Sequence, residues 1–174
     1  MTNMAVGIRT GSGIDHVLSN DAGNRKLITT LRRKDKAVLG LIADQNGGRD
    51  GLWVPLFGRL ASSFKGPGFL MRRYDVPAMA LVSIWEGDRY RMIMGPMIET
   101  VKTEDQERDI LINTARIQTI FEDLMRRYPE QWLWLHRRWK TQPEMIPEEE
   151  RVGRILTVEE WEKIRAPYAG ELFD

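Results

Sequence analysis

The 174-residue sequence contains no cysteine. Disulfide bonds, thiolate catalysis and cysteine-bound metal are therefore excluded, and the redox compartment stays undecided. The chain also lacks a charge imbalance, because 26 lysines and arginines stand against 25 aspartates and glutamates, for a formal net charge of +1. A nearly neutral protein has no overall field that attracts nucleic acid, so any basic function must be local.

Long apolar runs are absent as well. No stretch approaches the roughly 20 apolar residues that a membrane-spanning helix needs, and residues 1–21 lack the apolar core of a signal peptide. We therefore expect any contact with a membrane to be peripheral. The length suits a single domain, which we place at residues 1–143. The composition then becomes polar and acidic, which predicts a linker and a short helical tail at residues 144–174.

Hydrophobic periodicity predicts alternating helices and strands. Residues 104–128 place their apolar side chains on one helix face, with Thr103 and Gln106 as a capping box and Pro129 as the stop. Residues 38–43 form a continuous apolar run before a polar loop, which is typical of a strand buried on both faces of a parallel sheet. The predicted fold class is thus α/β, with a mixed, mainly parallel sheet flanked by helices and a C-terminal helical tail.

Shorter elements are predicted between these two. The sequence indicates a strand at residues 14–18, a helix that begins at Asn20 or Asp21, a helix after Gly66-Pro67-Gly68, an antiparallel hairpin of residues 78–85 and 90–94, and a tail helix with Thr157 and Glu160 as its capping box.

The glycine-rich sequence DQNGGRDG at residues 44–51 is the first candidate site. A buried parallel strand delivers the residues that follow it to the sheet edge where open α/β sheets bind ligands. Gly47, Gly48 and Gly51 would allow positive φ and close backbone approach, and Arg49 could meet a phosphate. An ordinary surface turn has the same composition, so that alternative stays open.

The second candidate site is the sequence YPEQWLWLHRRWKTQP at residues 128–143. Its amphipathic indoles and planar guanidinium groups suit a surface where apolar matter meets anionic head groups. The alternative is a final helix or strand that packs its tryptophans on the core and leaves its arginines in water. The run contains Trp132, Trp134, Trp139, His136, Arg137, Arg138 and Lys140.

The order Pro-Glu-Gln-Trp-x-Trp-x-His-Arg-Arg-Trp-Lys-Thr in this run resembles the C-terminal signature of the bacterial lipid A biosynthesis acyltransferases. These lauroyl and myristoyl transferases belong to the lysophospholipid acyltransferase superfamily. Asp44-Gln45, with the glycine-rich turn and the sequence Val-Pro-Leu-Phe-Gly at residues 54–58, is similar to the family's Asp-Gln/His to Pro-Phe-Phe-Gly segment. The resemblance covers residues 9–143 and implies a partial acyltransferase fold.

The resemblance also implies an activity. Family members move a fatty acyl chain from acyl carrier protein, or in some members from acyl-CoA, to a hydroxyl group of a glycolipid acceptor. They act at the cytoplasmic face of the bacterial inner membrane and need neither a metal nor another cofactor. On this resemblance Asp44 and Gln45 would shape the acceptor side of the cleft, Arg49 would contact an anion, and Arg137, Arg138 and Lys140 would hold phosphate or position the strand edge.

The family's catalytic pair has no clear counterpart. It consists of a histidine separated by four residues from an aspartate or glutamate, well upstream of the Asp-Gln loop, whereas only 43 residues precede Asp44 here. His16 and Asp21 match the spacing but lack the glycine and tryptophan neighbours, and such a pair also arises by chance. We favour coincidence, keep the pair as the sole catalytic candidate, and expect a truncated, split or otherwise incomplete acyltransferase.

Two other classes of function stay open. A non-catalytic lipid-binding or membrane-surface module derived from the same fold would use the tryptophan and arginine run to contact anionic lipid. A nucleic-acid binder would use the same cations and aromatic rings. We rank nucleic acid last and expect no such partner, because the basic residues occupy one short stretch rather than a broad face.

Overall fold

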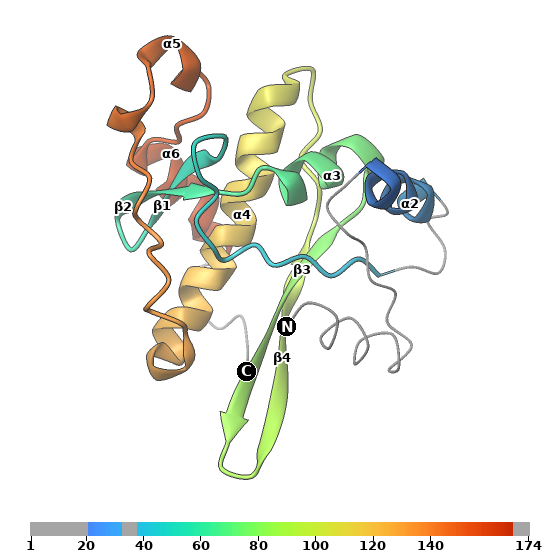
Figure 1. Cartoon of the computed structure of the whole chain (residues 1–174), viewed down its shortest axis with the longest axis vertical. Coiled ribbons are helices and arrows are strands. Elements are labelled where there is room, and N and C mark those ends of the chain that lie inside the picture. Colours follow the sequence, from blue (N-terminus) through green and yellow to red (C-terminus); the bar gives the residue numbers. More distant parts are fainter. Residues whose placement is uncertain (1–20, 33–37, 169–174) are drawn as a thin grey trace. The chain divides into compact units, whose positions relative to one another are not determined.

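The computed structural model describes residues 21–32 and 38–168 (Figure 1). The chain divides into two compact units, residues 1–40 and residues 41–174. In the first unit, helix α2 (Asp21–Arg32) confirms the helix predicted to begin at Asn20 or Asp21. The strand predicted at residues 14–18 lies outside the described residues.

The second unit is built around its longest helix, α4. Two antiparallel hairpins and helices α3 and α6 all contact α4 (Figure 1). The elements are β1 (Leu52–Leu56), β2 (Arg59–Ser63), α3 (Gly66–Tyr74), β3 (Ala78–Glu86), β4 (Arg89–Ile98), α4 (Gln106–Arg127), α5 (Glu148–Arg151) and α6 (Val158–Arg165), with 3-10 turns η1 (Pro129–Gln131), η2 (Pro143–Met145) and η3 (Ala166–Tyr168).

Helix α4 confirms the predicted helix and its stop at Pro129, but its N-terminal cap differs from the prediction. Asp105 is the N-cap, and its carboxylate accepts a hydrogen bond from the backbone N–H of Arg108 at 3.0 Å. The capping box expected from Thr103 and Gln106 is therefore wrong. Thr103 instead donates from its backbone N–H and its hydroxyl to the buried carboxylate of Asp109, at 2.7 and 2.8 Å.

The predicted mainly parallel sheet is not confirmed. Within the described residues the strands form two separate two-stranded sheets, β1–β2 and β3–β4, and both are antiparallel. Both pairs have two-residue turns, and such a short connection can join only antiparallel strands. The β3–β4 hairpin was predicted, whereas β1–β2 was not. Its turn places Phe57 and Gly58 at φ of 52° and 74°, a left-handed conformation that Gly58 adopts without strain.

The buried strand predicted at residues 38–43 is also wrong. These residues form no strand, and Leu41 and Ile42 are exposed. Only Ala43 is buried, and its carbonyl accepts a hydrogen bond of 2.8 Å from Nε2 of Gln118 on α4. An apolar run becomes a strand only when a neighbouring strand pairs with its backbone, and no described strand does so here.

The apolar face of α4 organises the core. Ile117, Ile120 and Leu124 pack against α3 and the β3–β4 hairpin, while Ile110 and Leu111 pack against β1 and the tail. In the tail, Trp161 of α6 is buried in the second of these clusters, and Thr157 and Glu160 form the predicted capping box. The helix expected around Trp161 is therefore confirmed.

A row of buried polar residues runs along the same helix. Asp109, Asn113, Gln118 and Glu122 are at most 2% exposed, although polar side chains of this kind are seldom buried without partners. Each one holds the backbone of another segment, at Thr103, Val101, Ala43 and Phe57 respectively. Helix α4 therefore positions loops through hydrogen bonds as well as packing on strands.

Candidate functional site

The two stretches singled out in the sequence meet in the structure, and Asn46 joins them. The Asn46 backbone N–H donates to Nε2 of His136 at 2.8 Å, and the Asn46 amide donates to the carbonyl of Arg138 at 3.0 Å. The Asn46 carbonyl oxygen accepts from the hydroxyl of Thr141 at 3.0 Å and from the N–H of Gly48 at 2.8 Å. Residues about 90 positions apart in the sequence thus form one connected site.

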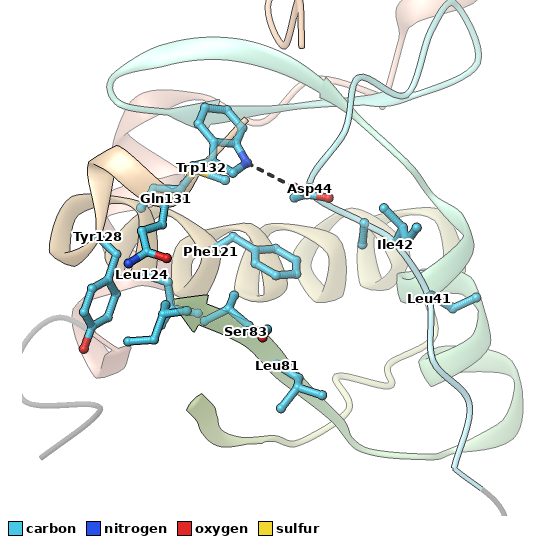
Figure 2. A pocket seen from close by; sticks show the side chains of 14 residues that line it. Leu41, Ile42, Asp44, Leu81, Ser83, Phe121, Leu124, Tyr128, Gln131 and Trp132 are labelled. Carbon is cyan, nitrogen blue, oxygen red and sulfur yellow. Dashed lines mark hydrogen bonds between the residues drawn. The ribbon is translucent and has the colours of Figure 1, made fainter. Parts of the chain in front are cut away.

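Asp44 provides a second link between the stretches. The indole N–H of Trp132 donates to Oδ2 of Asp44 at 3.0 Å, as the dashed line in Figure 2 shows. The other carboxylate oxygen has no hydrogen-bond partner in the part of the chain that the structure describes. It can therefore accept a hydrogen bond from a hydroxyl or amide group of a ligand.

The glycines of the loop allow it to lie directly against strand β2. A Cβ atom on Gly47 would come within 2.6 Å of the Ser63 backbone, and one on Gly51 within 2.0 Å of the Ser62 hydroxyl oxygen. Gly48 has a φ of +71°, which favours glycine. These observations confirm the roles that the sequence predicted for the three glycines, namely close backbone approach and positive φ.

Arg138 is fully buried between β2 and α4. Its guanidinium donates to the carbonyl of Ser62, to the hydroxyl of Ser63 at 2.6 Å and to Oε1 of Gln118 at 3.2 Å. Burial lowers the pKa of Arg138 to about 10, and the nearby negative charge of Asp44 opposes this shift. The group stays charged at neutral pH, so the site has an internal cation that holds the segment in place.

The other predicted cations lie at the surface. Arg137 and Lys140 are exposed, and neither side chain has a hydrogen-bond or ion-pair partner among the described residues. Arg49 is also exposed and makes one long contact of 3.4 Å to the carbonyl of Met145. Gln45 is half-buried. The structure thus separates one buried arginine from three cations that a dissolved or membrane-bound anion could reach.

The conformation of residues 128–143 matches neither a helix nor a strand. After the short turn η1 the chain forms successive turns, with Trp132 and Trp139 packed beside β1–β2 and Trp134 half-exposed. The alternative in which all tryptophans face the core and all arginines face water is therefore wrong. Arg138 lies in the core because carbonyl, hydroxyl and amide acceptors surround its guanidinium.

Arg154 in the tail is a site residue that sequence reasoning missed. Its guanidinium lies over the ring of Trp53 at 4.7 Å and donates to the carbonyls of Arg49 and Gly51. A parallel bridge between Trp53 and Ile155 brings it there. Asn46 was missed too, since a single asparagine in a polar loop carries no sequence signal of its partners.

An apolar cavity of about 280 Å³ lies next to Asp44. Loop residues 41–44, strand β3, helix α4 and Trp132 line it, and Figure 2 shows Phe121 and Leu124 of α4 beneath Asp44, Gln131 and Trp132. The volume is near the lower end of the roughly 300–1,000 Å³ of ligand pockets. Its apolar walls and carboxylate rim suit a ligand with an apolar chain and a hydroxyl-bearing head.

The sequence also raised the questions of a metal site, a membrane-spanning helix and the pair His16 and Asp21. Within residues 21–32 and 38–168 no three histidine, aspartate or glutamate side chains cluster closely enough to bind a metal ion. No helix in these ranges is both long and apolar enough to cross a membrane. His16 lies outside the described residues, as does the side chain of Asp21, so their pairing stays a prediction.

Comparison with known proteins identifies similar sequences. The sequence model of a family described as bacterial lipid A biosynthesis acyltransferase matches residues 1–141. The lipid A biosynthesis lauroyltransferase of Escherichia coli K12 is 32% identical over 104 residues, which cover 58% of this chain and 33% of that protein. The palmitoleoyltransferase of the same organism is 30% identical over 124 residues, or 69% of this chain and 39% of that protein. The matches thus span only 33–39% of these relatives' own length.

Proposed function

Because the chain belongs to the bacterial lipid A biosynthesis acyltransferase family, we propose that it carries the acceptor side of such an enzyme. The enzyme would move a fatty acyl chain from acyl carrier protein or acyl-CoA to a hydroxyl group of a glycolipid. The observation that carries this proposal is the Asp44 carboxylate, which lies at the rim of an apolar cavity and is tied by Trp132 to the family's signature run.

In this proposal different side chains bind different parts of the acceptor. The free oxygen of Asp44 accepts a hydrogen bond from a sugar hydroxyl or amide, and the cavity takes part of an acyl chain. Exposed Arg49, Arg137 and Lys140 bind anionic groups of the glycolipid. Buried Arg138 does not touch the acceptor but positions the loop that does, in keeping with its hydrogen bonds to β2.

The acyl transfer step needs a base that the described residues do not supply. The acceptor hydroxyl attacks the thioester carbonyl, a base takes the hydroxyl proton, and the thiolate leaves with a proton from that base. His136 is not the base in this proposal, because its Nε2 already accepts the N–H of Asn46. His16 with Asp21 remains the only candidate pair in this chain, and the site of action is proposed as the cytoplasmic face of the inner membrane.

Binding of a phosphorylated glycolipid acceptor tests the proposal. We expect the acceptor, in detergent micelles, to change the tryptophan emission of the purified 174-residue chain through Trp132. Asp44→Ala should weaken binding by about tenfold, because a charge-assisted hydrogen bond is lost. Asp50→Ala is the matched control, since Asp50 is an exposed carboxylate on the same loop. Equal affinity of both variants and the wild type would overturn the role of Asp44.

An assay with a radiolabelled acyl donor then separates enzyme from binding module. Transfer that disappears in His16→Ala would make His16 and Asp21 the catalytic pair. Acceptor binding without transfer would mean that this chain carries only the acceptor side of the enzyme. Vesicle binding without acceptor binding or transfer would favour the alternative, a non-catalytic lipid-binding module, which the exposure of Leu133, Trp134 and Leu135 also favours. Absence of both binding and transfer in folded protein would contradict the proposed function.

A further inference from the structure

Three consecutive apolar side chains are exposed in the segment that follows η1. Leu133 is 61% exposed, Trp134 50% and Leu135 90%. Single exposed apolar residues are ordinary on protein surfaces, but three in a row on one loop mark a contact surface. Residues 133–140, called the docking loop below, also contain the exposed cations Arg137 and Lys140.

The docking loop is held in one conformation by its own backbone. The N–H of His136 donates to the carbonyl of Leu133 at 3.0 Å, and the N–H of Lys140 donates to the carbonyl of Arg137 at 3.0 Å. Its base is fixed by the buried guanidinium of Arg138 and by the bond from Asn46 to His136. The apolar side chains are therefore presented by an ordered scaffold, and little conformational entropy is lost when the loop binds.

The charge and shape of the loop favour an anionic lipid surface as its partner. Between Pro129 and Thr141 the only acidic residue is Glu130, whereas Arg137 and Lys140 add two exposed positive charges. Leu135 is almost fully exposed, so it stands out from the protein and does not line a groove. A protruding apolar tip beside cations fits an interface in which apolar chains lie beneath anionic head groups.

A pair of exposed aromatic side chains is tied to η1, the turn that precedes the docking loop. Oε1 of Gln131 accepts the backbone N–H of Trp85 at 2.6 Å, and Nε2 of Gln131 donates to the backbone carbonyl of Trp85 at 2.9 Å, which ties η1 to the tip of the β3–β4 hairpin. Trp85 and Tyr90 are 46% and 70% exposed, and their ring centroids are 4.8 Å apart. Tryptophan and tyrosine are enriched where proteins meet the membrane interface.

The docking loop also adjoins the apolar cavity. Trp132, the residue immediately before Leu133, lines the cavity and holds Asp44. None of residues 133–140 lines the cavity, so the connection between the docking loop and the cavity runs through Trp132. A lipid partner fits this arrangement, because Trp132 joins the loop to a cavity whose lining is mostly apolar.

We propose that residues 133–140 dock this protein on an anionic bilayer. Leu133, Trp134 and Leu135 enter the interface, and Arg137 and Lys140 bind head-group phosphates. Residues 133–140 would thus make the membrane contact that the proposed function requires. This proposal rests on the proposed function only for which membrane the protein meets. Docking itself requires neither the glycolipid acceptor nor the acyl donor.

Vesicle co-sedimentation of the whole chain tests the proposal. We use phosphatidylcholine vesicles with and without phosphatidylglycerol, and no glycolipid or acyl donor. We expect binding to the anionic vesicles that weakens at high salt, because salt screens the cations. Leu133→Ser/Leu135→Ser should reduce binding by about tenfold, and Arg137→Gln/Lys140→Gln by about thirtyfold on anionic vesicles.

Matched variants elsewhere on the surface show whether any loss of exposed apolar side chains or of positive charge weakens vesicle binding. Val152→Ser/Val158→Ser removes two valines of the tail that are 75% and 50% exposed, and Lys65→Gln/Lys102→Gln removes two exposed cations. Both controls should bind vesicles like the wild type. Leu135→Ser alone keeps the test possible if the double variant does not fold, as judged by circular dichroism.

Several outcomes would overturn the proposal. These are no binding to anionic vesicles, equal losses in loop and control variants, or a loop variant that changes the oligomeric state without changing vesicle binding. The last result would identify the loop as a protein interface. Vesicle binding combined with the absence of both acceptor binding and acyl transfer would leave the docking proposal standing while the proposed function fails, so the two are separable.

Discussion

Helix α4 and residues 128–143 adjoin in the chain, but different forces hold them. The helix buries an apolar stripe and has its own backbone hydrogen bonds, whereas the following segment has no regular pattern and depends on partners far away in the sequence. Arg138 shows the contrast best, since it is fully buried while its neighbour Arg137 is exposed. Residue type alone does not distinguish these two arginines, and only the acceptors around Arg138 do.

Replacement of Arg138 should have the largest effect on stability. Arg138→Ala removes the donor to Oε1 of Gln118 and to the Ser63 hydroxyl, and one of two donors to the Ser62 carbonyl. It also removes the cation near Asp44, so we expect a loss of about 3–5 kcal/mol in the free energy of unfolding. Urea unfolding followed by circular dichroism measures it. Arg137→Ala is the matched control, expected within about 0.5 kcal/mol of the wild type. Similar losses in both variants would erase the contrast between buried and exposed arginine.

The pH dependence of stability tests the burial of Arg138 in a second way. Burial lowers the pKa of Arg138 in the folded state to about 10, below its value in the unfolded chain. Between these two pKa values the unfolded chain binds more protons than the folded protein, so the free energy of unfolding rises with pH in that range. The free-energy cost of burying the charged guanidinium is therefore fully present below the folded-state pKa and declines above it. The stability difference between wild type and Arg138→Ala should stay constant from roughly pH 6 to 9.

Replacement of Asn46 should have an intermediate effect confined to the long-range contacts. Asn46→Ala removes side-chain hydrogen bonds to Gly48, Thr141 and the Arg138 carbonyl, so we expect a loss of about 2 kcal/mol. Hydrogen exchange should increase in residues 44–51 and 132–141 but not in α4. Gln45→Ala is the neighbouring control. Increased exchange along α4 would mean that the helix depends on this site as well.

Replacement of the α4 cap should have the smallest effect and should act on the helix alone. Asp105→Ala removes the acceptor for the Arg108 N–H, which costs about 1 kcal/mol, whereas Gln106→Ala should be close to neutral. Unfolding in urea compares the two variants. A larger loss in Gln106→Ala than in Asp105→Ala would restore the capping box that the sequence predicted.

The comparison also explains which predictions succeeded. The apolar stripe of α4, the β3–β4 hairpin and the α6 capping box depend on residues close in the sequence, and all three were predicted correctly. Residues 38–43 were predicted wrongly because a buried strand needs a partner, and the apolar run contains no information about one. The β1–β2 hairpin was missed because its turn uses Phe57, a residue unusual at positive φ.

Sequence alone was enough to pick out the two stretches of the candidate site and to suggest the family that the comparisons then supported. Glycine spacing and the tryptophan and arginine run are local features, and they can be recognised without coordinates. Only the tertiary structure decided that Asn46 joins the two stretches, that Asp44 faces an apolar cavity and that Arg138 is internal. Those facts depend on burial and on hydrogen bonds between distant residues, which the order of residues along the chain does not reveal.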